Sequence, residues 1–396
     1  MKKIVLLAVL LAAAACSKPA GVVTESEIPP FAQKVNASFD NGNVELYAFY
    51  TDPLKPQHGQ SFKVVSFWRF KKQLPDGYKM FFHFEDPAGE QIFVYDHPFA
   101  DGRMKELPLK DIIRDDASIK ELPVWFDSDK MIINAGFFKG DVRLTPDQKF
   151  NDGKNRMKLP PVEISKPKLV KKQMKVFAVA GESRNQIKID GKLKESYWQN
   201  AQTGGKFWLT SGENLAQKQT NVLTSMDEKN LYIAFDCEDD DVYATLKNND
   251  DKIYDQDDVV EVFIDGDGDK DEYWEMQVSA AGVKFDSSFK GGPRKNQDVA
   301  WDSGMKYAVQ VNGTLNKSDD TDKGWSAEIA IPWATIADSV HIPPKDGDVW
   351  KVYFYRIDRN GNNKKPEFSA WVPPYKGDFH YLRFMGDLIF VYEEIL

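Results

Sequence analysis

The stretch Tyr254–Asp286 limits the possible fold more than any other part of the chain. It contains two runs, Asp258–Ile264 and Glu272–Ser279, that are rich in β-branched and aromatic residues, and such residues favour strands. The segment between them, Asp265–Asp271, is acidic and carries glycines, which tolerate the positive φ angles of tight turns. The pattern therefore predicts an antiparallel hairpin closed by an acidic turn.

Side chains of a strand point alternately to opposite faces, so the hairpin has two faces of different chemistry. One predicted face is apolar and belongs to a core; it carries Val260, Val262, Ile264, Trp274, Met276 and Val278. The other predicted face, directed outward, mixes carboxylates, an amide and rings; it carries Val259, Glu261, Phe263, Tyr273, Glu275 and Gln277. Such a face suits a sugar, whose hydroxyls need fixed polar partners and whose C–H surface packs on rings. It equally suits the solvated outside of a β-sandwich.

The remainder of the chain is also predicted to be all-β. A chain of 396 residues is long enough for two or three domains of roughly 100–200 residues each. Residues 36–165 contain short alternating runs separated by Pro-, Asp- and Gly-rich turns, which is typical of a sandwich and loosely resembles Ig-like accessory domains. The predicted strands are Val44–Tyr50, Phe62–Phe70, Lys79–Glu85, Gln91–Tyr95, Met131–Phe137 and Lys158–Ile164. We therefore expect an all-β fold of two β-sandwich domains.

Composition places the domain boundaries. Residues 17–35 contain Pro, Ala and Ser without a strong period and are predicted to be a tether. Residues 166–184 are rich in Lys and Pro and are predicted to be a linker. The second domain is then expected to span residues 185–396.

The N-terminus has the features of an export signal. Lys2 and Lys3 precede a short apolar segment, and small residues lead directly to Cys16. Residues 1–16 resemble a bacterial lipoprotein signal peptide, which implies that Cys16 is acylated and anchors the chain to a membrane. Ser17, a non-acidic residue after the cysteine, implies sorting to the outer membrane. We expect an outer-membrane lipoprotein of the cell envelope, periplasmic or surface-facing; the alternative is an ordinary cleaved signal peptide.

Charge and cysteine content restrict the partners. The formal net charge is −9, which argues against nucleic acid as a partner because phosphate backbones are bound through basic surfaces. Of the two cysteines, only Cys237 would be left if Cys16 is acylated, so a disulfide framework is excluded. Cys237 shares the parity of apolar strand neighbours and is expected to be a small buried hydrophobe.

An ordered series of motifs in the second domain closely resembles the carbohydrate-binding module family 9-like domain, over about Arg184–Leu396. The motifs, in chain order, are Ile189–Leu193, Tyr197-Trp198, Thr220–Val222, Leu231–Cys237, the DDVVEVF hairpin, Gly324–Trp333, Trp350–Arg356, Trp371–Pro373 and Phe379–Phe390. The resemblance implies a β-sandwich that holds the reducing-end sugar of a glycan between two aromatic rings, helped by polar groups of the central hairpin.

The resemblance also implies site residues. The family's hairpin glutamate matches Glu261, while Gln277 stands where the family has a basic residue. The two sandwiching rings fall near Tyr254 and near His380, with Phe379 as the neighbour of the second. The aromatic pair is thus altered, which puts the identity of the sugar in doubt.

Two further residues are candidates from their own chemistry. Arg356 ends a predicted strand and offers five fixed donors for hydroxyls or a carboxylate; its alternative role is a structural ion pair. Trp371, just before Pro373, could form a stacking platform; its alternative place is the core.

The acidic turn is a candidate metal site. Asp265, Asp267, Asp269 and Asp271 alternate around two glycines, and carboxylate oxygens suit Ca²⁺. The alternative is a solvated turn without an ion.

These observations predict a membrane-tethered, non-catalytic lipoprotein whose C-terminal domain binds a polysaccharide or oligosaccharide. One alternative is an envelope scaffold that binds no sugar. Another is an accessory to a glycoside hydrolase, or, with Glu261 and Glu275 as paired carboxylates, a hydrolase itself. A haem-binding alternative would need Met276 as ligand, but alternation places Met276 in the core.

Overall fold

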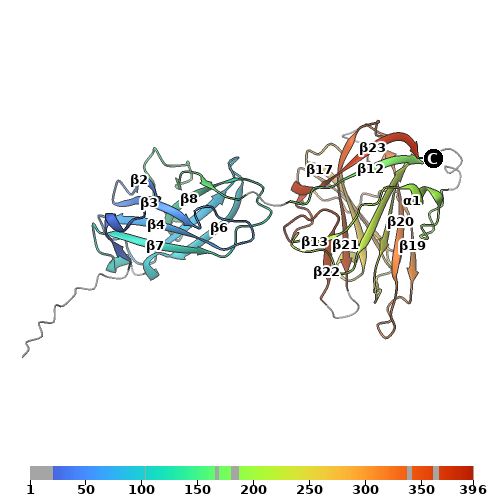
Figure 1. The fold of residues 1–396 in the computed structure, drawn as a ribbon, viewed down its shortest axis with the longest axis horizontal. Coiled ribbons are helices and arrows are strands. Elements are labelled where there is room, and N and C mark those ends of the chain that lie inside the picture. Colours follow the sequence, from blue (N-terminus) through green and yellow to red (C-terminus); the bar gives the residue numbers. More distant parts are fainter. Residues whose placement is uncertain are drawn as a thin grey trace, which may run out of the picture. The chain divides into compact units, whose positions relative to one another are not determined.

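The computed structural model describes residues 21–102, 104–165, 169–179, 187–336, 341–359 and 365–395. The chain divides into two compact units, Met1–Lys168 and Leu169–Leu396, and each is built almost entirely of strands (Figure 1). Cys16 and the start of the predicted tether lie outside the described residues. Among the residues described, no helix is both long and apolar enough to cross a membrane.

The first unit is a sandwich of two mainly antiparallel sheets. One sheet has five strands in the order β1-β7-β4-β3-β2, and the other has six, with β10-β8-β5-β6 as its path and β9 and β11 paired to β8. The strands are β1 (Val22–Val23), β2 (Gln33–Phe39), β3 (Val44–Asp52), β4 (Phe62–Phe70), β5 (Lys79–Glu85), β6 (Gln91–Pro98), β7 (Ile112–Ile119), β8 (Lys130–Lys139), β9 (Val142–Arg143), β10 (Met157–Lys158) and β11 (Val162–Glu163). One core, which includes Trp68 of β4 and Phe137 of β8 with ring centroids 4.9 Å apart, joins the two sheets.

The predicted strands of this unit are found with small changes at their ends. The predicted strand Lys158–Ile164 is instead two short strands, β10 and β11, that both pair with β8. Pro160 and Pro161 separate them, because proline cannot donate a hydrogen bond to a strand ladder.

The second unit is a 12-stranded sheet folded around one core, a β-sandwich. Its path is β18-β17-β16-β21-β23-β12-β14-β15-β20-β19, and β13 and β22 lie beside it. A short helix, α1 (Ser196–Asn200), packs near β14. The strands are β12 (Gln173–Val179), β13 (Trp208–Leu209), β14 (Thr220–Met226), β15 (Asn230–Cys237), β16 (Val259–Asp265), β17 (Glu272–Ser279), β18 (Lys284–Lys290), β19 (Lys306–Asn312), β20 (Gly324–Pro332), β21 (Val349–Asp358), β22 (Glu367–Ala370) and β23 (Gly386–Ile395).

The two halves of this sheet face each other across the core. Phe235 of β15 and Phe354 of β21 lie in edge-to-face contact, with centroids 5.8 Å apart. Cys237 is buried in the same core, as its parity predicted.

The predicted linker is partly wrong. Residues 173–179 form β12, which runs parallel to both β14 and β23 inside the second unit. Alternation of Met174, Val176 and Ala178 buries one face of this strand. Lysines precede and interrupt this apolar alternation, so the sequence favoured a polar linker over a strand.

Candidate functional site

The site is built on the hairpin of β16 and β17, which lies inside the sheet between β21 and β18. The register sets Glu261 opposite Gln277 and Val262 opposite Met276. The apolar face is buried in the core as alternation predicted, and Val260, Val262 and Met276 are fully covered.

The second face of the hairpin is not directed outward to solvent, which corrects our expectation. Glu261, Gln277 and Glu275 are 2%, 1% and 4% exposed. Later segments of the chain cover this face: the ring of His380 lies 5.0 Å from that of Phe263, and the backbone N–H of Arg294 donates to the hydroxyl of Tyr273 at 3.0 Å. Glu261 therefore lies at the base of a cavity.

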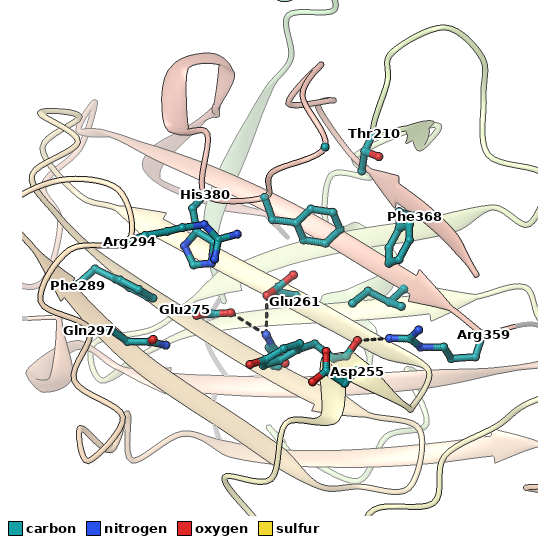
Figure 2. Close-up of a pocket in the computed structure, with 15 residues that line it drawn as sticks. Thr210, Asp255, Glu261, Glu275, Phe289, Arg294, Gln297, Arg359, Phe368 and His380 are labelled. Carbon is teal, nitrogen blue, oxygen red and sulfur yellow. Dashed lines mark hydrogen bonds between the residues drawn. The ribbon is translucent and has the colours of Figure 1, made fainter. Parts of the chain in front are cut away.

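This cavity, called here the hairpin pocket, has a volume of about 440 Å³, within the range of small-molecule sites. Its floor consists of the buried Glu261, Glu275 and Gln277, and the two glutamates are labelled in Figure 2. Rings form its walls, and the more exposed Arg294 and Arg359 stand at its rim. The wall rings are those of Tyr254, Phe289, Phe368, Phe379 and His380.

One amide holds the floor together. The Nε2 group of Gln277 donates to Oε1 of Glu261 at 2.6 Å and to Oε1 of Glu275 at 2.7 Å. Ser287 donates its hydroxyl to Oε2 of Glu275 at 3.0 Å. Two acceptors, Oε2 of Glu261 and Oε1 of Gln277, have no hydrogen-bond partner within the described part of the chain. Buried polar atoms are nearly always paired, so these two atoms are suited to a ligand.

Burial also changes the acidity of the floor. It raises the pKa of Glu261 well above its ordinary value, and the nearby charge of Glu275 raises it further. Burial raises the pKa of Glu275 as well. The charged form of a carboxyl group is disfavoured by both effects, so this pair retains a proton to higher pH than solvated glutamates do.

Two of the predicted rings line the pocket, but they differ in role. Tyr254 is half-buried and lies edge-on to Phe285, with centroids 5.6 Å apart. His380 is buried, and its Nδ1 is hydrogen-bonded to the hydroxyl of Tyr273 at 2.8 Å. Burial lowers the pKa of His380 to about 4. Its neighbour Phe379 is half-exposed and stacks on Tyr355 at 4.1 Å, so Phe379 offers the more open ring.

Arg356 does not reach the pocket, which corrects its assignment as a ligand contact. It lies opposite Val260, on the core side of β21, and is fully buried. Its Nη2 group donates to Asp239 at 2.8 Å and to Asp358 at 3.2 Å. The structural ion pair, the alternative left open by the sequence, is the role that Arg356 has.

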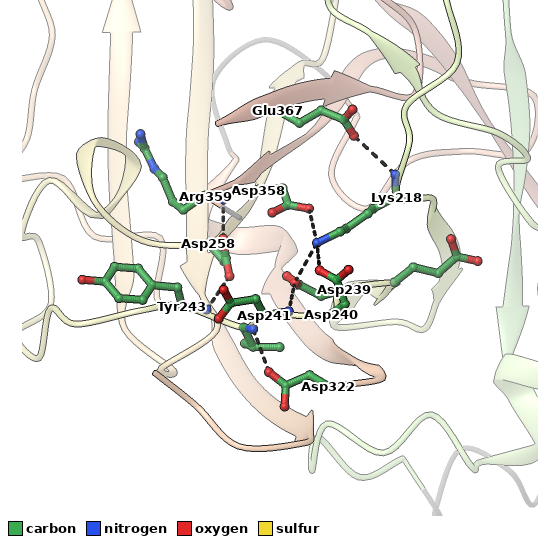
Figure 3. A network of polar contacts seen from close by, with 12 residues as sticks. Lys218, Asp239, Asp240, Asp241, Tyr243, Asp258, Asp322, Asp358, Arg359 and Glu367 are labelled. Carbon is green, nitrogen blue, oxygen red and sulfur yellow. Dashed lines mark hydrogen bonds and ion pairs between the residues drawn. The ribbon is translucent and has the colours of Figure 1, made fainter. Parts of the chain in front are cut away.

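The acidic groups around Arg356 form one network. Carboxylate oxygens of Asp239, Asp258 and Asp358 lie within 4.8 Å of one another. Lys218 approaches this group at 3.6 Å from Asp239 and 3.9 Å from Asp358 (Figure 3). Asp258 accepts hydrogen bonds from the backbone N–H groups of Tyr243 and Arg359, both at 2.6 Å. The network thus fixes the loops beside the hairpin.

Trp371 is also absent from the pocket, which corrects its assignment as a stacking platform. Its side chain is fully buried, and Nε1 donates to the carbonyl of Gly204 at 2.6 Å. Its ring packs on Phe354 with centroids 5.5 Å apart. A Cβ atom at Gly386 would lie 2.4 Å from Trp371, so the core contains a close-fitting slot for this ring.

The acidic turn brings part of its predicted metal set together. Carboxylate oxygens of Asp265, Asp267 and Asp269 lie within 4.8 Å of one another, and Asp271 is not in this group. Asp265 is buried and accepts from the backbone N–H groups of Gly268 at 2.8 Å and Lys270 at 3.1 Å. Burial raises the pKa of Asp265 to about 6.

Several pocket residues were not predicted from the sequence as sugar contacts. Arg294, Arg359 and Phe289 reach the pocket from loops and strand ends. The sequence contains no periodic signal that could have placed them there. Glu275 was visible on the same face as Glu261, although only the hydrolase alternative used it.

The second unit matches a known protein family. The family described as carbohydrate family 9 binding domain-like matches residues 189–392. Endo-1,4-beta-xylanase A of Thermoanaerobacterium saccharolyticum is 26% identical over 203 residues, which are 51% of this chain. The chain spans only 15% of the length of that xylanase.

Two solved structures are similar at low identity. A protein from Bacteroides uniformis ATCC 8492 has a TM-score of 0.42 and 17% identity, and the match covers 55% of this chain and 99% of that one. A carbohydrate binding module family 9 from Caldicellulosiruptor kristjanssonii in complex with cellotriose has a TM-score of 0.36 and 13% identity, over 56% of this chain and 95% of that one. Through residues 189–392, the chain belongs to the carbohydrate family 9 binding domain-like family.

Proposed function

We propose that the chain is a non-catalytic lipoprotein that binds a saccharide in the hairpin pocket of its C-terminal domain. The observation that carries this proposal is the pair of unpartnered acceptors, Oε2 of Glu261 and Oε1 of Gln277, at the base of a ring-lined cavity. They lie in a domain of a carbohydrate-binding family.

The chemistry of the pocket matches that of a pyranose. Sugar hydroxyls can donate to the floor, and a hydrogen bond to a charged group contributes about 1.5–3 kcal/mol. The half-exposed rings of Tyr254 and Phe379 offer apolar surface to the C–H groups of a sugar. With these rings in place of a pair of tryptophans, we expect a dissociation constant on the order of 0.1–1 mM for a mono- or disaccharide.

The arrangement of the carboxylates supports binding rather than hydrolysis. In glycosidases the two carboxyl groups flank the scissile bond. Here Glu261 and Glu275 both accept from Nε2 of Gln277, on the floor, and so approach a ligand from one side. The likeness to part of a xylanase also fits a role as accessory to a glycoside hydrolase.

Replacing Glu261 with Gln should weaken saccharide binding about tenfold, because one of the two carboxylate acceptors, such as the unpartnered Oε2, is replaced by an amide donor. Isothermal titration calorimetry of the chain from Ser17 onward, against glucose, cello- and xylo-oligosaccharides and peptidoglycan fragments, measures this. The fold should persist, since the substitution keeps the shape of the side chain and removes one of two neighbouring buried charges.

The matched control is Glu272→Gln in β17, the partner strand of the hairpin. Glu272 lies outside the pocket and is 3.8 Å from Lys290, so its substitution should leave binding unchanged. Equal affinity of Glu261→Gln and the wild type would contradict the assignment of Glu261 to the site.

Lipid anchoring is proposed at Cys16. Replacing Cys16 with Ala should move the protein from the membrane fraction to the soluble fraction, because a covalently attached acyl group supplies the membrane affinity. Fractionation followed by immunoblotting, with Cys237→Ala as the control, measures this. Detergent dependence that stays the same in Cys16→Ala would count against acylation.

Ca²⁺ is proposed to bind at the turn of Asp265, Asp267 and Asp269, whose carboxylates are hard oxygen donors. An ion that binds only the folded state raises the free energy of unfolding by about 2.7 kcal/mol at a hundredfold excess over its dissociation constant. Thermal melts with Ca²⁺ and with a chelator should therefore separate, and those of an Asp267→Asn, Asp269→Asn double variant should coincide. If the wild-type melts with Ca²⁺ and with a chelator coincide, the turn does not bind Ca²⁺.

A further inference from the structure

The floor of the hairpin pocket has an excess of acceptors. Glu261 and Glu275 share a single amide donor, Nε2 of Gln277. Oε2 of Glu261 and Oε1 of Gln277 remain without a partner among the residues described, and both side chains are more than nine-tenths buried. A ligand that satisfies this floor must bring donors.

The cation that acts on these carboxyl groups, Arg294, stands at the rim and not on the floor: its charge lowers the pKa of both glutamates, but burial raises the pKa of each by more. No Lys, Arg or His side chain of the described residues forms an ion pair with Glu261 or Glu275. Arg294 is engaged at the rim by Asp378, at 2.7 Å. Arg359, labelled in Figure 2, donates to the backbone carbonyl group of Tyr254 and, at 3.4 Å, to that of Asp257, which the figure does not draw.

Burying two neighbouring carboxylates without a compensating partner is unfavourable in free energy, because both lose water and they repel each other. In the empty pocket a proton can relieve the repulsion, consistent with the raised pKa of Glu261. A ligand ammonium group can take the place of this proton. It carries three donors and can reach several floor acceptors at once.

Polarity along the depth of the pocket sets the orientation of such a ligand. The unpartnered acceptors lie at the floor, whereas the more exposed lining offers the donors of Arg294, Arg359 and Thr210 together with one carboxylate, Asp255. We propose that the hairpin pocket binds amino sugars with a free amino group in preference to neutral sugars, with the ammonium group on Glu261 and Glu275 and the hydroxyls toward the rim. This inference rests on the proposed saccharide binding and specifies its ligand class.

The first test needs no substitution. Calorimetric titrations of the chain from Ser17 onward compare D-glucosamine, D-glucose, N-acetyl-D-glucosamine and ethylamine at roughly pH 6, below the pKa of about 8 of an α-amino group. We expect glucosamine to bind about tenfold more tightly than glucose, because a charged donor replaces a neutral one on a carboxylate. The N-acetylated sugar should lose this advantage, and ethylamine, which has no ring, should bind more weakly than glucosamine.

The second test changes the floor. Glu275→Gln keeps the shape and removes one charge, so the ratio of the glucose and glucosamine dissociation constants should fall to within about threefold. Glu272→Gln, outside the pocket on the same strand, should leave the ratio unchanged.

The outcomes separate the two proposals. If glucose binds and glucosamine binds no more tightly, or if Glu275→Gln keeps the wild-type ratio, the amino-sugar inference is wrong and saccharide binding stands. Ethylamine binding as tight as that of glucosamine would also overturn the inference. If none of these sugars and no oligosaccharide binds, saccharide binding itself is wrong.

Discussion

Replacing Arg356 with Met should destabilise the C-terminal domain by about 3–5 kcal/mol, the typical cost of removing one partner from a buried ion pair. Arg356 is fully buried and donates to Asp239 and Asp358. Without it, these two carboxylates lose their closest ion pair in the described part of the chain, while the more distant Lys218 remains at 3.6 Å from Asp239 and 3.9 Å from Asp358. Urea denaturation followed by tryptophan fluorescence measures the free energy of unfolding.

This loss of stability should shrink as pH falls, because protonation neutralises the carboxylates that have lost Arg356. Burial and the charge of Asp239 already raise the pKa of Asp258 above its ordinary value. A group with a raised folded-state pKa contributes stability below its unfolded pKa and loses it as pH rises through the folded pKa. The deficit of Arg356→Met should therefore be largest at neutral and alkaline pH.

Arg294→Met is the matched control for this substitution. Arg294 pairs with Asp378 at the pocket rim, and its side chain is 60% exposed; exposed pairs contribute about 0–1 kcal/mol. If Arg356→Met were as stable as the wild type but had lost saccharide binding, Arg356 would be a ligand contact after all and the structural role would be wrong.

Replacing Trp371 with Ala should cost about 3–5 kcal/mol, the usual range for a large aromatic residue in a core. The ring fills a slot between Phe354 and Gly386, and its loss leaves a cavity and removes the hydrogen bond of Nε1 to the carbonyl of Gly204. Thermal and chemical denaturation of the variant check this expectation.

Phe368→Ala provides the comparison for Trp371→Ala. Phe368 is 38% exposed and lies edge-on to Phe379 at the pocket wall, so its loss should cost much less stability than that of Trp371 and should weaken saccharide binding. The reverse pattern, a stable Trp371→Ala variant with lost binding, would restore Trp371 as a platform.

The hairpin could be predicted from sequence because strand alternation is a local property. Parity alone placed Val260, Val262 and Met276 in the core and Glu261 beside Gln277. What covers the second face could not be predicted in this way. His380 and the loop around Arg294 are distant in sequence and reach Tyr273 only through tertiary packing.

Arg356 and Trp371 were misplaced for two different physical reasons. β21 is apolar on both faces, with Phe354 and Tyr355 both fully buried, so hydrophobic alternation cannot tell which face is the core. Trp371 follows a strand of only four residues, Glu367–Ala370, too short for a period. Both Nη groups of Arg356 and Nε1 of Trp371 have hydrogen-bond partners within the protein and do not face the pocket.

Saccharide binding in the hairpin pocket is tested most directly by an NMR titration of the isotopically labelled chain from Ser17 onward. We predict that glucose, glucosamine or a cello-oligosaccharide at up to about 10 mM, above the expected dissociation constant, shifts the backbone amide resonances of β16, β17 and residues 377–380. These segments line the pocket. Absence of shifts with every sugar, or shifts confined to other parts of the chain, would contradict the account.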